Sequence, residues 1–432
     1  MTAAERFDVA IVGGGIAGLS CACEAAAAGL STAVFERGEE CGAKNVSGGR
    51  LYLGPLGGLL PAFWKDAPFE RRVARETLTF VSGATTASVD LQSPRLTEEA
   101  TASHTVLRAR LDRWLAERAI EAGAMVVPQA RVDSLVVRDG AVAGVCIAGE
   151  QIEAEVVVAA DGALSRLAQD AGLAAAPRPE HLALGVKEVV SLDQGRLEDR
   201  FGIGPGEGAA RLLVGDFTRG VPGGGFLYTN RDSVSVGVVV RLDVLGGAGP
   251  QGPESHALLD AMRAVPAVAR LLAGGRTEEY AAHLVPESSL DHAPRRSMPG
   301  LLVVGDAAGF VLNHGFTVRG MDFAIAAGIL AARALASTRE QGGSHTAAQA
   351  YELGLCSSFV LRDLDAGRHS GTFLARERLY GHYPRAACEL LEEMFCFGAE
   401  GKGRVAKPLW KRLRGDFANW QGLRDIWAAR KL

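Results

Sequence analysis

The chain has 432 residues, of which 48% are hydrophobic and 22% charged, and its formal net charge is −4 at pH 7. This composition is typical of a folded globular protein, and the length favours two structural units with an added C-terminal element. The acidic balance offers no basic field for a phosphate backbone, so we expect no nucleic-acid partner.

The N-terminal residues lead directly into a strand-like run. The sequence MTAAERFDVAIV lacks the charged start, apolar stretch and small-residue cleavage site of a signal peptide, which favours a cytoplasmic protein. A second apolar stretch, LYLGPLGGLLPAFW from Leu51 to Trp64, is broken by glycine and proline. We expect it to be a buried loop, with contact to a membrane surface as the alternative.

Residues Phe7 to Arg37 have the pattern of a dinucleotide-binding unit. DVAIV predicts a buried parallel strand, AGLSCACEAAAAG a helix packed on it, and STAVFE a second strand. Between them, Gly13 allows a tight turn, Gly15 lets the backbone approach a pyrophosphate, and Gly18 permits close packing of helix on strand.

An acidic residue ends the second strand of this unit. The carboxylate of Glu36 can accept hydrogen bonds from ribose hydroxyls and would repel the 2′-phosphate of NADP. The pattern therefore predicts FAD or NAD, and we place the adjacent Arg37 in the same site.

Two later aspartates favour FAD. The strand in IEAEVVVAADGALSRLA ends at Asp161 and Gly162, and the strand in GLLVVGDAAGF ends at Gly305 and Asp306. Ligands of parallel α/β sheets bind at the carboxyl ends of strands. One such aspartate could be only a helix N-cap, but two in one chain are better explained by a long flavin nucleotide.

The segment from Arg211 to Leu242 alternates polar and apolar residues and contains turn residues near 222–225 and 230–232. This pattern predicts antiparallel strands, which we expect to roof the flavin ring. Tyr228 on these strands is a candidate for a polar contact to flavin or substrate, or else a structural hydroxyl.

The C-terminal part is rich in helix-forming and aromatic residues. KPLWKRLRGDFANWQGLRDIWAARKL, from Lys407 to Leu432, is basic and amphipathic and carries Trp410, Trp420 and Trp427. Such a helix can cover the core or dock on a membrane or a partner. The seven cysteines contain no CxxC pair, so we expect no metal site; Cys41, beside a glycine, is a candidate reactive thiol.

The three motifs GxGxxG, ADG and GDAAG occur in the order that resembles FAD proteins built like p-hydroxybenzoate hydroxylase and geranylgeranyl reductase. Six further stretches resemble the FixC family, which is related to electron-transfer flavoprotein–quinone oxidoreductase. These stretches are GAKNVSGGRLY (42–52), VLRARLDRWL (106–115), LGVKEVV (184–190), GGGFLYTN (223–230), HLVPE (283–287) and GFTVRGMDFAIAAG (315–328). The resemblance spans roughly residues 5 to 330 and weakens in the last hundred.

The resemblance implies an α/β fold: a Rossmann-type FAD-binding domain with an inserted antiparallel sheet domain and a C-terminal helical segment. We assign residues 1–80, 101–180 and 281–340 to the first, 81–100 and 181–280 to the second, and 341–432 to the third. Asp306 and its glycines would meet the ribityl and pyrophosphate groups, and Arg108 would open a helix passing the cofactor or simply pair on the helix surface. The residues implied to line the isoalloxazine are Ala43, Lys44, Asn45, Gly48, Gly315, Gly320 and Met321.

The function implied is electron transfer through FAD between an electron-transfer flavoprotein or a small-molecule donor and a quinone or another acceptor. A small ferredoxin-like protein would be a further partner, because Cys388 and Cys396 cannot form the four-cysteine cluster segment of the large quinone oxidoreductases.

A second departure is His314, in a position where the family pattern suggests an apolar residue. The imidazole could exchange protons near neutral pH or could be held by backbone hydrogen bonds. It motivates an alternative function, oxidation or double-bond reduction of a small biosynthetic metabolite. A flavin monooxygenase is a further alternative, although GDAAGFVLNHGF lacks the histidine and proline that usually follow the aspartate motif in aromatic hydroxylases.

Overall fold

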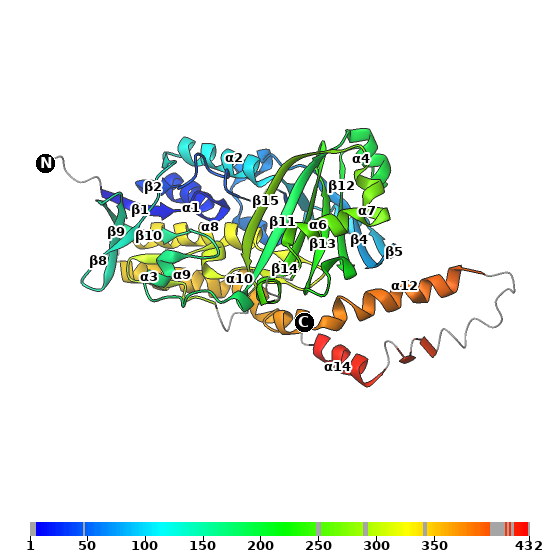
Figure 1. The fold of residues 1–432 in the computed structure, drawn as a ribbon. Coiled ribbons are helices and arrows are strands. Elements are labelled where there is room, and N and C mark those ends of the chain that lie inside the picture. Colours follow the sequence, from blue (N-terminus) through cyan, green and yellow to red (C-terminus); the bar gives the residue numbers. More distant parts are fainter. Residues whose placement is uncertain are drawn as a thin grey trace.

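The computed structural model describes residues 6–45, 48–247, 252–287, 293–339, 344–397, 411–412, 414–415 and 419–430. Two β-sheets lie beside each other, helices cover the outer faces, and a C-terminal helical arm extends past the larger sheet (Figure 1).

The smaller sheet carries the nucleotide pattern, with the strand order β16-β17-β10-β1-β2-β7. The central strand β1 (Arg6–Val12) pairs in parallel with β10 and with β2, so the carboxyl ends of these strands share one edge. The remaining bounds are β2 (Thr32–Phe35), β7 (Met125–Val127), β8 (Ser134–Arg138), β9 (Ala141–Ile147), β10 (Glu150–Ala159), β16 (Ser297–Met298) and β17 (Leu301–Val303). The parallel pairing confirms the predicted Rossmann-type unit.

Two alanine-rich helices pack closely beside this sheet. Helix α1 (Ile16–Ala27) contacts α8 (Met321–Thr338) at Gly328, where a Cβ atom would lie only 2.2 Å from the carbonyl oxygen of Ala17. By length and composition α8 is the one helix in the described ranges that could cross a membrane, but most of it is buried in the core. The other helices of this half are α2 (Arg108–Glu121), α3 (Arg166–Asp170), α9 (Ser344–Ser357) and α10 (Phe359–Ala366).

The larger sheet has the order β15-β11-β14-β13-β12-β4-β6-β3, with β5 on β4. Its strands are β3 (Gly49–Tyr52), β4 (Arg72–Ser82), β5 (Thr85–Gln92), β6 (Ser103–Val106), β11 (Leu182–Ser191), β12 (Glu207–Gly215), β13 (Gly223–Thr229), β14 (Ser233–Arg241) and β15 (Arg276–Pro286). Most neighbours are antiparallel, as predicted, but β12 and β4 are parallel. A separate hairpin joins β18 (Leu312–Asn313) and β19 (Val318–Arg319).

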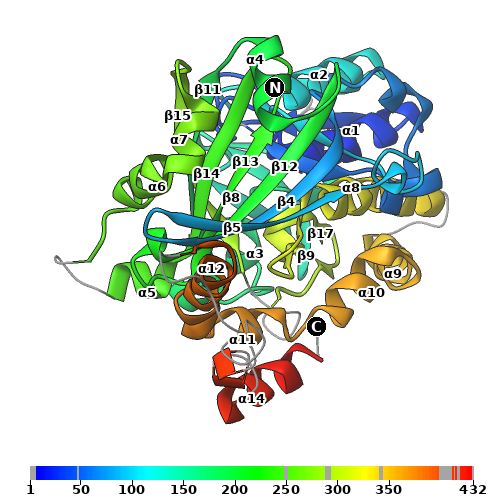
Figure 2. The ribbon, with the colours of Figure 1, turned by 90° about the vertical axis from the view of Figure 1, so that its right-hand side faces the viewer.

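Helices lie along the β11–β14 side of the larger sheet, as the second view shows (Figure 2). These are α4 (Gln194–Phe201), α5 (Leu242–Gly247), α6 (Ser255–Ala264) and α7 (Pro266–Leu272). Val265 stands between α6 and α7, and Pro266 begins α7, where its missing N–H and fixed φ are tolerated. Val186, Val236 and Leu258 belong to the second hydrophobic core that this packing forms.

The sheets and the expected domain boundaries do not coincide everywhere. The boundary near residue 80 falls within β4, and the boundary near 280 falls within β15. The apolar stretch 51–64 enters two 3₁₀ turns, Gly54–Leu59 and Ala62–Asp66, and buries Leu56 and Trp64 in the core. This burial agrees with the expected loop.

The C-terminal arm contains α11 (Ser370–Leu374), α12 (His382–Phe395) and α14 (Trp420–Ala429) (Figure 1). The buried carboxylate of Asp425 on α14 pairs with Arg376 at 2.5 Å and Arg378 at 3.2 Å, and accepts a hydrogen bond from the Tyr383 hydroxyl at 2.5 Å. These contacts tie the last described helix to α12 and to the segment between α11 and α12. Trp410 lies outside the described residues.

Candidate functional site

The glycine turn after β1 has the close contacts that its sequence predicts. Gly13 has φ of +110°, and a Cβ atom there would lie 2.3 Å from the carbonyl oxygen of Ala160 at the end of β10. A Cβ at Gly18 would lie 2.1 Å from the carbonyl oxygen of Gly13. Larger residues at these positions would push β1, α1 and β10 apart.

The N-terminus of α1 has the features of an anion-binding site. Gly15 is the N-cap, and no side chain caps the helix. A Cβ at Gly15 would still lie 3.8 Å from both the Arg108 guanidinium and the Asn45 amide, so the backbone faces a polar space. Free N–H groups, the helix dipole and a nearby guanidinium together suit a pyrophosphate.

The carboxylate of Glu36 lies against the glycine turn. It accepts hydrogen bonds from the Gly14 N–H at 2.7 Å and the Gly38 N–H at 2.6 Å, one on each oxygen. Each oxygen keeps a further lone pair, so the half-buried side chain can still accept a ribose hydroxyl. Arg37, next to it, is exposed.

Arg108 is held rigidly beside this turn. Its guanidinium makes two bonds to the fully buried carboxylate of Asp112, at 3.0 and 2.9 Å, one helical turn away on α2. Asp112 also accepts from the Asn45 amide. Burial raises the pKa of Asp306, and the nearby charge of Arg108 opposes that rise. The sequence did not single out Asp112, although its i+4 spacing from Arg108 could have indicated it.

A cavity of about 460 Å³ begins at this point and runs between the two sheets. Ile16, Asn45, Arg108 and Asp306 line one part. Gly48, Lys187, Tyr228 and His283 line the face of the larger sheet, and Phe373, Leu374 and Tyr380 from the C-terminal part complete the wall. The volume is in the usual range for a cofactor or ligand pocket.

Lys187 is the most unusual side chain in this cavity. It lies on β11, is only 7% exposed, and its ammonium donates to the carbonyl oxygen of Gly48. Burial lowers its pKa well below the ordinary value, and the positive charge of Arg108 adds to the effect. Burial, Arg108 and Lys187 also lower the pKa of His283 on β15. We missed both residues as site candidates, although LGVKEVV and HLVPE contain them.

Tyr228 lies in a polar group on the sheet. Its ring stacks on Phe226 with 4.8 Å between centroids, and burial raises the pKa of its hydroxyl. Nearby, Arg50 pairs with Glu76 and lies 4.5 Å above the Tyr52 ring. The hydroxyl of Tyr228 therefore stays protonated at the cavity wall, and its role remains a prediction.

Asp161 lies beside the glycine turn but is engaged locally. Its carboxylate accepts from the Ser165 hydroxyl at 2.6 Å and from the Leu167 N–H at 3.2 Å, at the start of α3. It is not among the residues lining the cavity, and neither is Gly162, which has a positive φ of +86°. Helix capping accounts for the contacts observed, and cofactor contact by this pair remains a prediction.

The predicted ring-lining residues divide into two groups. Asn45, Gly48, Gly315, Gly320 and Met321 line the cavity, whereas Ala43 and Lys44 are exposed and do not. Val46 and Ser47 of the same loop lie outside the described residues. Gly305 has φ of +63° and packs against Ala17, so the absence of a side chain at Gly305 allows α1 to pack closely there.

His314 lines the cavity in the β18–β19 hairpin. Its Nε2 atom is buried without a hydrogen-bond partner among the described residues, and a Cβ at Gly367 would lie 2.6 Å from it. Burial lowers the pKa of the imidazole, and Arg319 lowers it further. The ring is therefore neutral near pH 7, and its catalytic role remains a prediction.

Cys41 does not fit the role of a reactive thiol. It is buried beneath Gly14, and desolvation together with Glu36 and Asp112 raises its pKa to about 12. A thiol must ionise to react, so Cys41 is inert at neutral pH. Within the described ranges, no group of three or more His, Cys, Asp or Glu side chains could hold a metal ion.

Comparisons with known proteins agree with this geometry. A family model described as FAD dependent oxidoreductase matches residues 8–85. The probable electron transfer flavoprotein-quinone oxidoreductase YdiS of Escherichia coli K12 is 40% identical over 412 residues, covering 95% of this chain and 94% of that protein. Protein FixC of the same strain is 41% identical over 405 residues, covering 94% of each.

Solved structures share the fold. A geranylgeranyl bacteriochlorophyll reductase-like protein from Thermoplasma acidophilum superposes with a TM-score of 0.70 at 21% identity, covering 98% of this chain and 99% of that one. The myxobacterial FAD-dependent halogenase CndH gives a TM-score of 0.67 at 17% identity, with 97% and 99% covered. At these identities the likeness establishes the architecture alone.

Proposed function

Because the chain belongs to the FAD-dependent electron-transfer oxidoreductase family of FixC and YdiS, we propose that it passes electrons from an electron-transfer flavoprotein to a quinone. The cavity carries this proposal. It joins a polar part suited to a dinucleotide to an apolar part lined by Phe373 and Leu374, and a quinone ring requires an apolar site.

The described residues fit FAD. When bound, FAD supplies the two-electron chemistry at its isoalloxazine ring. Glu36 would accept the adenosine ribose, and the N-terminus of α1 at Gly15 would hold the pyrophosphate. Arg108, fixed by Asp112, would keep a positive charge beside it, and Lys187 would add a hydrogen-bond donor.

The apolar part of the cavity would hold the acceptor and exclude water. Leu374 lies over Gly315, where a Cβ atom would be 3.1 Å from the leucine side chain. The hydroxyl of Tyr380 donates to the carbonyl oxygen of Leu374 at 2.6 Å and so fixes this wall. Excluding water strengthens each polar interaction that positions the acceptor.

The test is anaerobic reduction of the purified protein. We expect reduced electron-transfer flavoprotein subunits to bleach the flavin absorbance, and a short-chain benzoquinone to restore it. Reduction by a small metabolite alone would favour the alternative function, oxidation or double-bond reduction of a biosynthetic compound. NADPH consumption with hydrogen peroxide or a hydroxylated product would favour a monooxygenase.

His314 is proposed as an acid–base group in the reductive half-reaction. His314→Ala should slow reduction about 10²–10⁴-fold while FAD content hardly changes, because no hydrogen bond from the Nε2 atom holds the hairpin among the described residues. Stopped-flow reduction at the flavin absorbance measures this rate. A wild-type rate per bound flavin would remove His314 from the mechanism.

A ferredoxin-like protein and a membrane surface are further proposed partners. Exposed apolar side chains on α14, Trp420, Ile426 and Trp427, support membrane contact, because tryptophan favours the membrane interface. Co-sedimentation with anionic vesicles should fall in Trp420→Ser. Equal binding by the wild type and the variant would argue against contact through α14.

A further inference from the structure

Glu287 follows the last residue of β15 and faces the apolar part of the cavity. Its N–H donates to the carbonyl oxygen of His181 at 2.8 Å, which fixes the backbone. Its carboxyl accepts one long hydrogen bond, 3.4 Å, from the amide of Asn313 on β18. The side chain is thus positioned at the cavity wall, and among the described residues Asn313 is the one hydrogen-bond donor to its carboxyl.

Two carboxyl groups line the described cavity, and they differ in their surroundings. Asp306 lies near the charge of Arg108, at the polar part. Glu287 makes no ion pair among the described residues, and the guanidinium of Arg241, whose charge acts on it, is bound to Asp243 by two bonds of 3.0 and 2.7 Å. A carboxyl group with these surroundings is suited to holding a proton.

Charged and titratable groups of the described residues lie near Glu287 on several elements. They are Arg241 on β14, Asp243 on α5, His314 in the hairpin and Tyr380 in the C-terminal wall. Burial raises the pKa of Glu287, Arg241 opposes the rise, and Asp243 adds to it. His314 has a lowered pKa, and burial raises that of Tyr380, so both rings are uncharged near neutral pH.

We propose that Glu287 is the proton donor to the electron acceptor in this cavity, an inference that rests on the quinone as the proposed acceptor. Reduction of a quinone to a hydroquinone requires two electrons and two protons. Both electrons and one proton come from the reduced cofactor. The second proton passes from the Glu287 carboxyl to a quinone oxygen, and the carboxylate that remains takes a proton from water.

The experiment compares two acceptors in wild type, Glu287→Gln and a control, Glu278→Gln. Glu278 lies on the same strand, is exposed and pairs with Arg276. After anaerobic reduction, each protein is mixed with a short-chain benzoquinone, which takes electrons and protons, or with ferricenium, which takes electrons alone. We expect Glu287→Gln to slow quinone reduction about 10²–10⁴-fold and to leave ferricenium reduction unchanged.

Two further measurements separate a proton donor from a structural residue. The wild-type quinone rate should fall as pH rises through the raised pKa of the carboxyl, and this dependence should vanish in Glu287→Gln. Infrared difference spectra recorded across the pH range in which the quinone rate changes should contain a carboxyl band that the variant lacks, whether or not FAD is bound.

Equal loss of both acceptor reactions, or normal quinone reduction by Glu287→Gln, would overturn the proposal, as would absence of the infrared band. A wild type that reduces ferricenium and no quinone would instead contradict the proposed acceptor, and the Glu287 step with it. The two failures are therefore distinct.

Discussion

Burial and neighbouring charge change the chemistry of individual side chains in this cavity. Lys187 loses water on β11 and faces the charge of Arg108, so its pKa falls, whereas Glu287 loses water without an ion pair and its pKa rises. Cys41 becomes inert for the same reason of desolvation. Each effect follows from the cost of transferring a charge from water into protein.

Replacing Lys187 by methionine should have opposite effects on the apoprotein and the holoprotein. The change removes a buried amine whose hydrogen-bond partner among the described residues is the carbonyl oxygen of Gly48, so the apoprotein should melt at the same or a higher temperature. FAD affinity should fall about tenfold, since a charged hydrogen bond contributes on the order of 1.5–3 kcal/mol. Titration with FAD and calorimetry measure the two effects, with the exposed Lys65→Met as control. An unchanged affinity of Lys187→Met for FAD would contradict the proposed contact between Lys187 and FAD.

Two substitutions of Glu36 should weaken FAD binding to different extents. Glu36→Gln keeps one acceptor oxygen, but the other becomes an amide that cannot accept the Gly14 or Gly38 N–H. Glu36→Arg also introduces the wrong charge and should cost about 1–3 kcal/mol of FAD binding. Fluorescence titration of the apoprotein should rank affinity as wild type, then glutamine, then arginine. Equal affinity in all three would refute our placement of the ribose.

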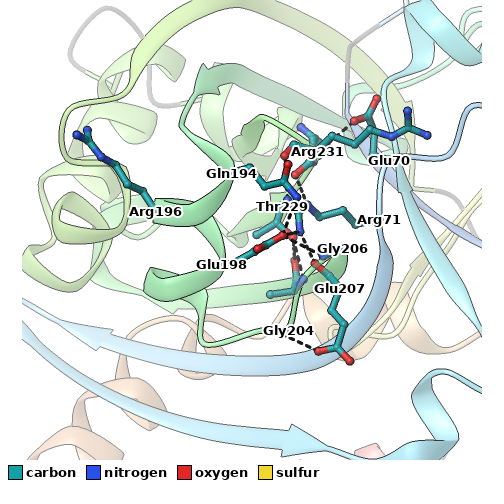
Figure 3. A network of polar contacts seen from close by, with 12 residues as sticks. Glu70, Arg71, Gln194, Arg196, Glu198, Gly204, Gly206, Glu207, Thr229 and Arg231 are labelled. Atoms are coloured by element: carbon teal, nitrogen blue, oxygen red, sulfur yellow. Dashed lines mark hydrogen bonds and ion pairs between the residues drawn. The ribbon is translucent and has the colours of Figure 1, made fainter.

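At the scale of elements, one buried arginine connects segments far apart in sequence (Figure 3). Arg71, just before β4, donates to the carbonyl oxygens of Asn230 at 2.6 Å and Arg231 at 2.9 Å in the β13–β14 turn. It also bonds the Glu207 carbonyl oxygen and the Glu198 carboxylate on α4, both at 2.8 Å. These bonds hold the start of β4 beside β12 and the β13–β14 turn.

Arg71→Ala should destabilise the protein strongly. It removes a donor from three backbone carbonyl oxygens, and each buried carbonyl left unsatisfied costs about 1–3 kcal/mol. Urea unfolding followed by circular dichroism measures the loss. Arg178→Ala, which breaks the exposed pair with Glu180, should change stability by about 0–1 kcal/mol and serves as control. If both variants lost a similar free energy of unfolding, the hydrogen bonds of Arg71 would contribute no more to stability than an exposed ion pair.

The contribution of the Arg71–Glu198 pair to stability should decrease at acid pH. Hydrogen bonds from the Gly206 N–H, Arg71 and Gln194 lower its pKa from 4.5 to about 2. A lowered pKa means that the carboxylate stabilises the fold above pH 4.5, and that this stability is lost as pH falls from 4.5 towards 2. The melting temperatures of wild type and Glu198→Gln should therefore differ most at neutral pH and converge in acid. A constant difference across this range would contradict the assigned pKa.

At the scale of the whole molecule, the cavity exists because three parts meet. The smaller sheet provides the glycine turn, the larger sheet provides Lys187 and Glu287, and the C-terminal part closes the wall at Leu374 and Tyr380. The arm thus belongs to the site, although its sequence resembles the family only loosely. This arrangement predicts that α14 affects the cavity indirectly, through Asp425.

Asp425→Asn should loosen the arm without unfolding the two sheets. The change weakens the pairs with Arg376 and Arg378 and the bond from Tyr383, whose side chain also lines the cavity. Limited proteolysis should cleave the C-terminal part faster, while the main melting transition stays within a few degrees of wild type. Unchanged cleavage would show that other contacts hold α14.

The sequence alone determined the nucleotide half of this protein. Gly13, Gly15, Gly18 and Glu36 lie within one strand–helix–strand unit, where local spacing dictates geometry, and the predicted parallel sheet is present. The family resemblance added FAD and electron transfer, in agreement with the relatives. These inferences succeeded because their residues act through backbone conformation and short-range order, which a single sequence contains.

Only the tertiary structure decided which side chains share the cavity. Lys187 and Glu287 come from strands a hundred residues apart, and Arg71 finds its partners more than a hundred residues away. It also showed that Asp161 accepts hydrogen bonds from Ser165 and Leu167 at the start of α3, and that Ala43 and Lys44 are exposed and lie outside the cavity lining. Burial and long-range contact set the charge and role of these groups, and neither can be worked out from local sequence spacing.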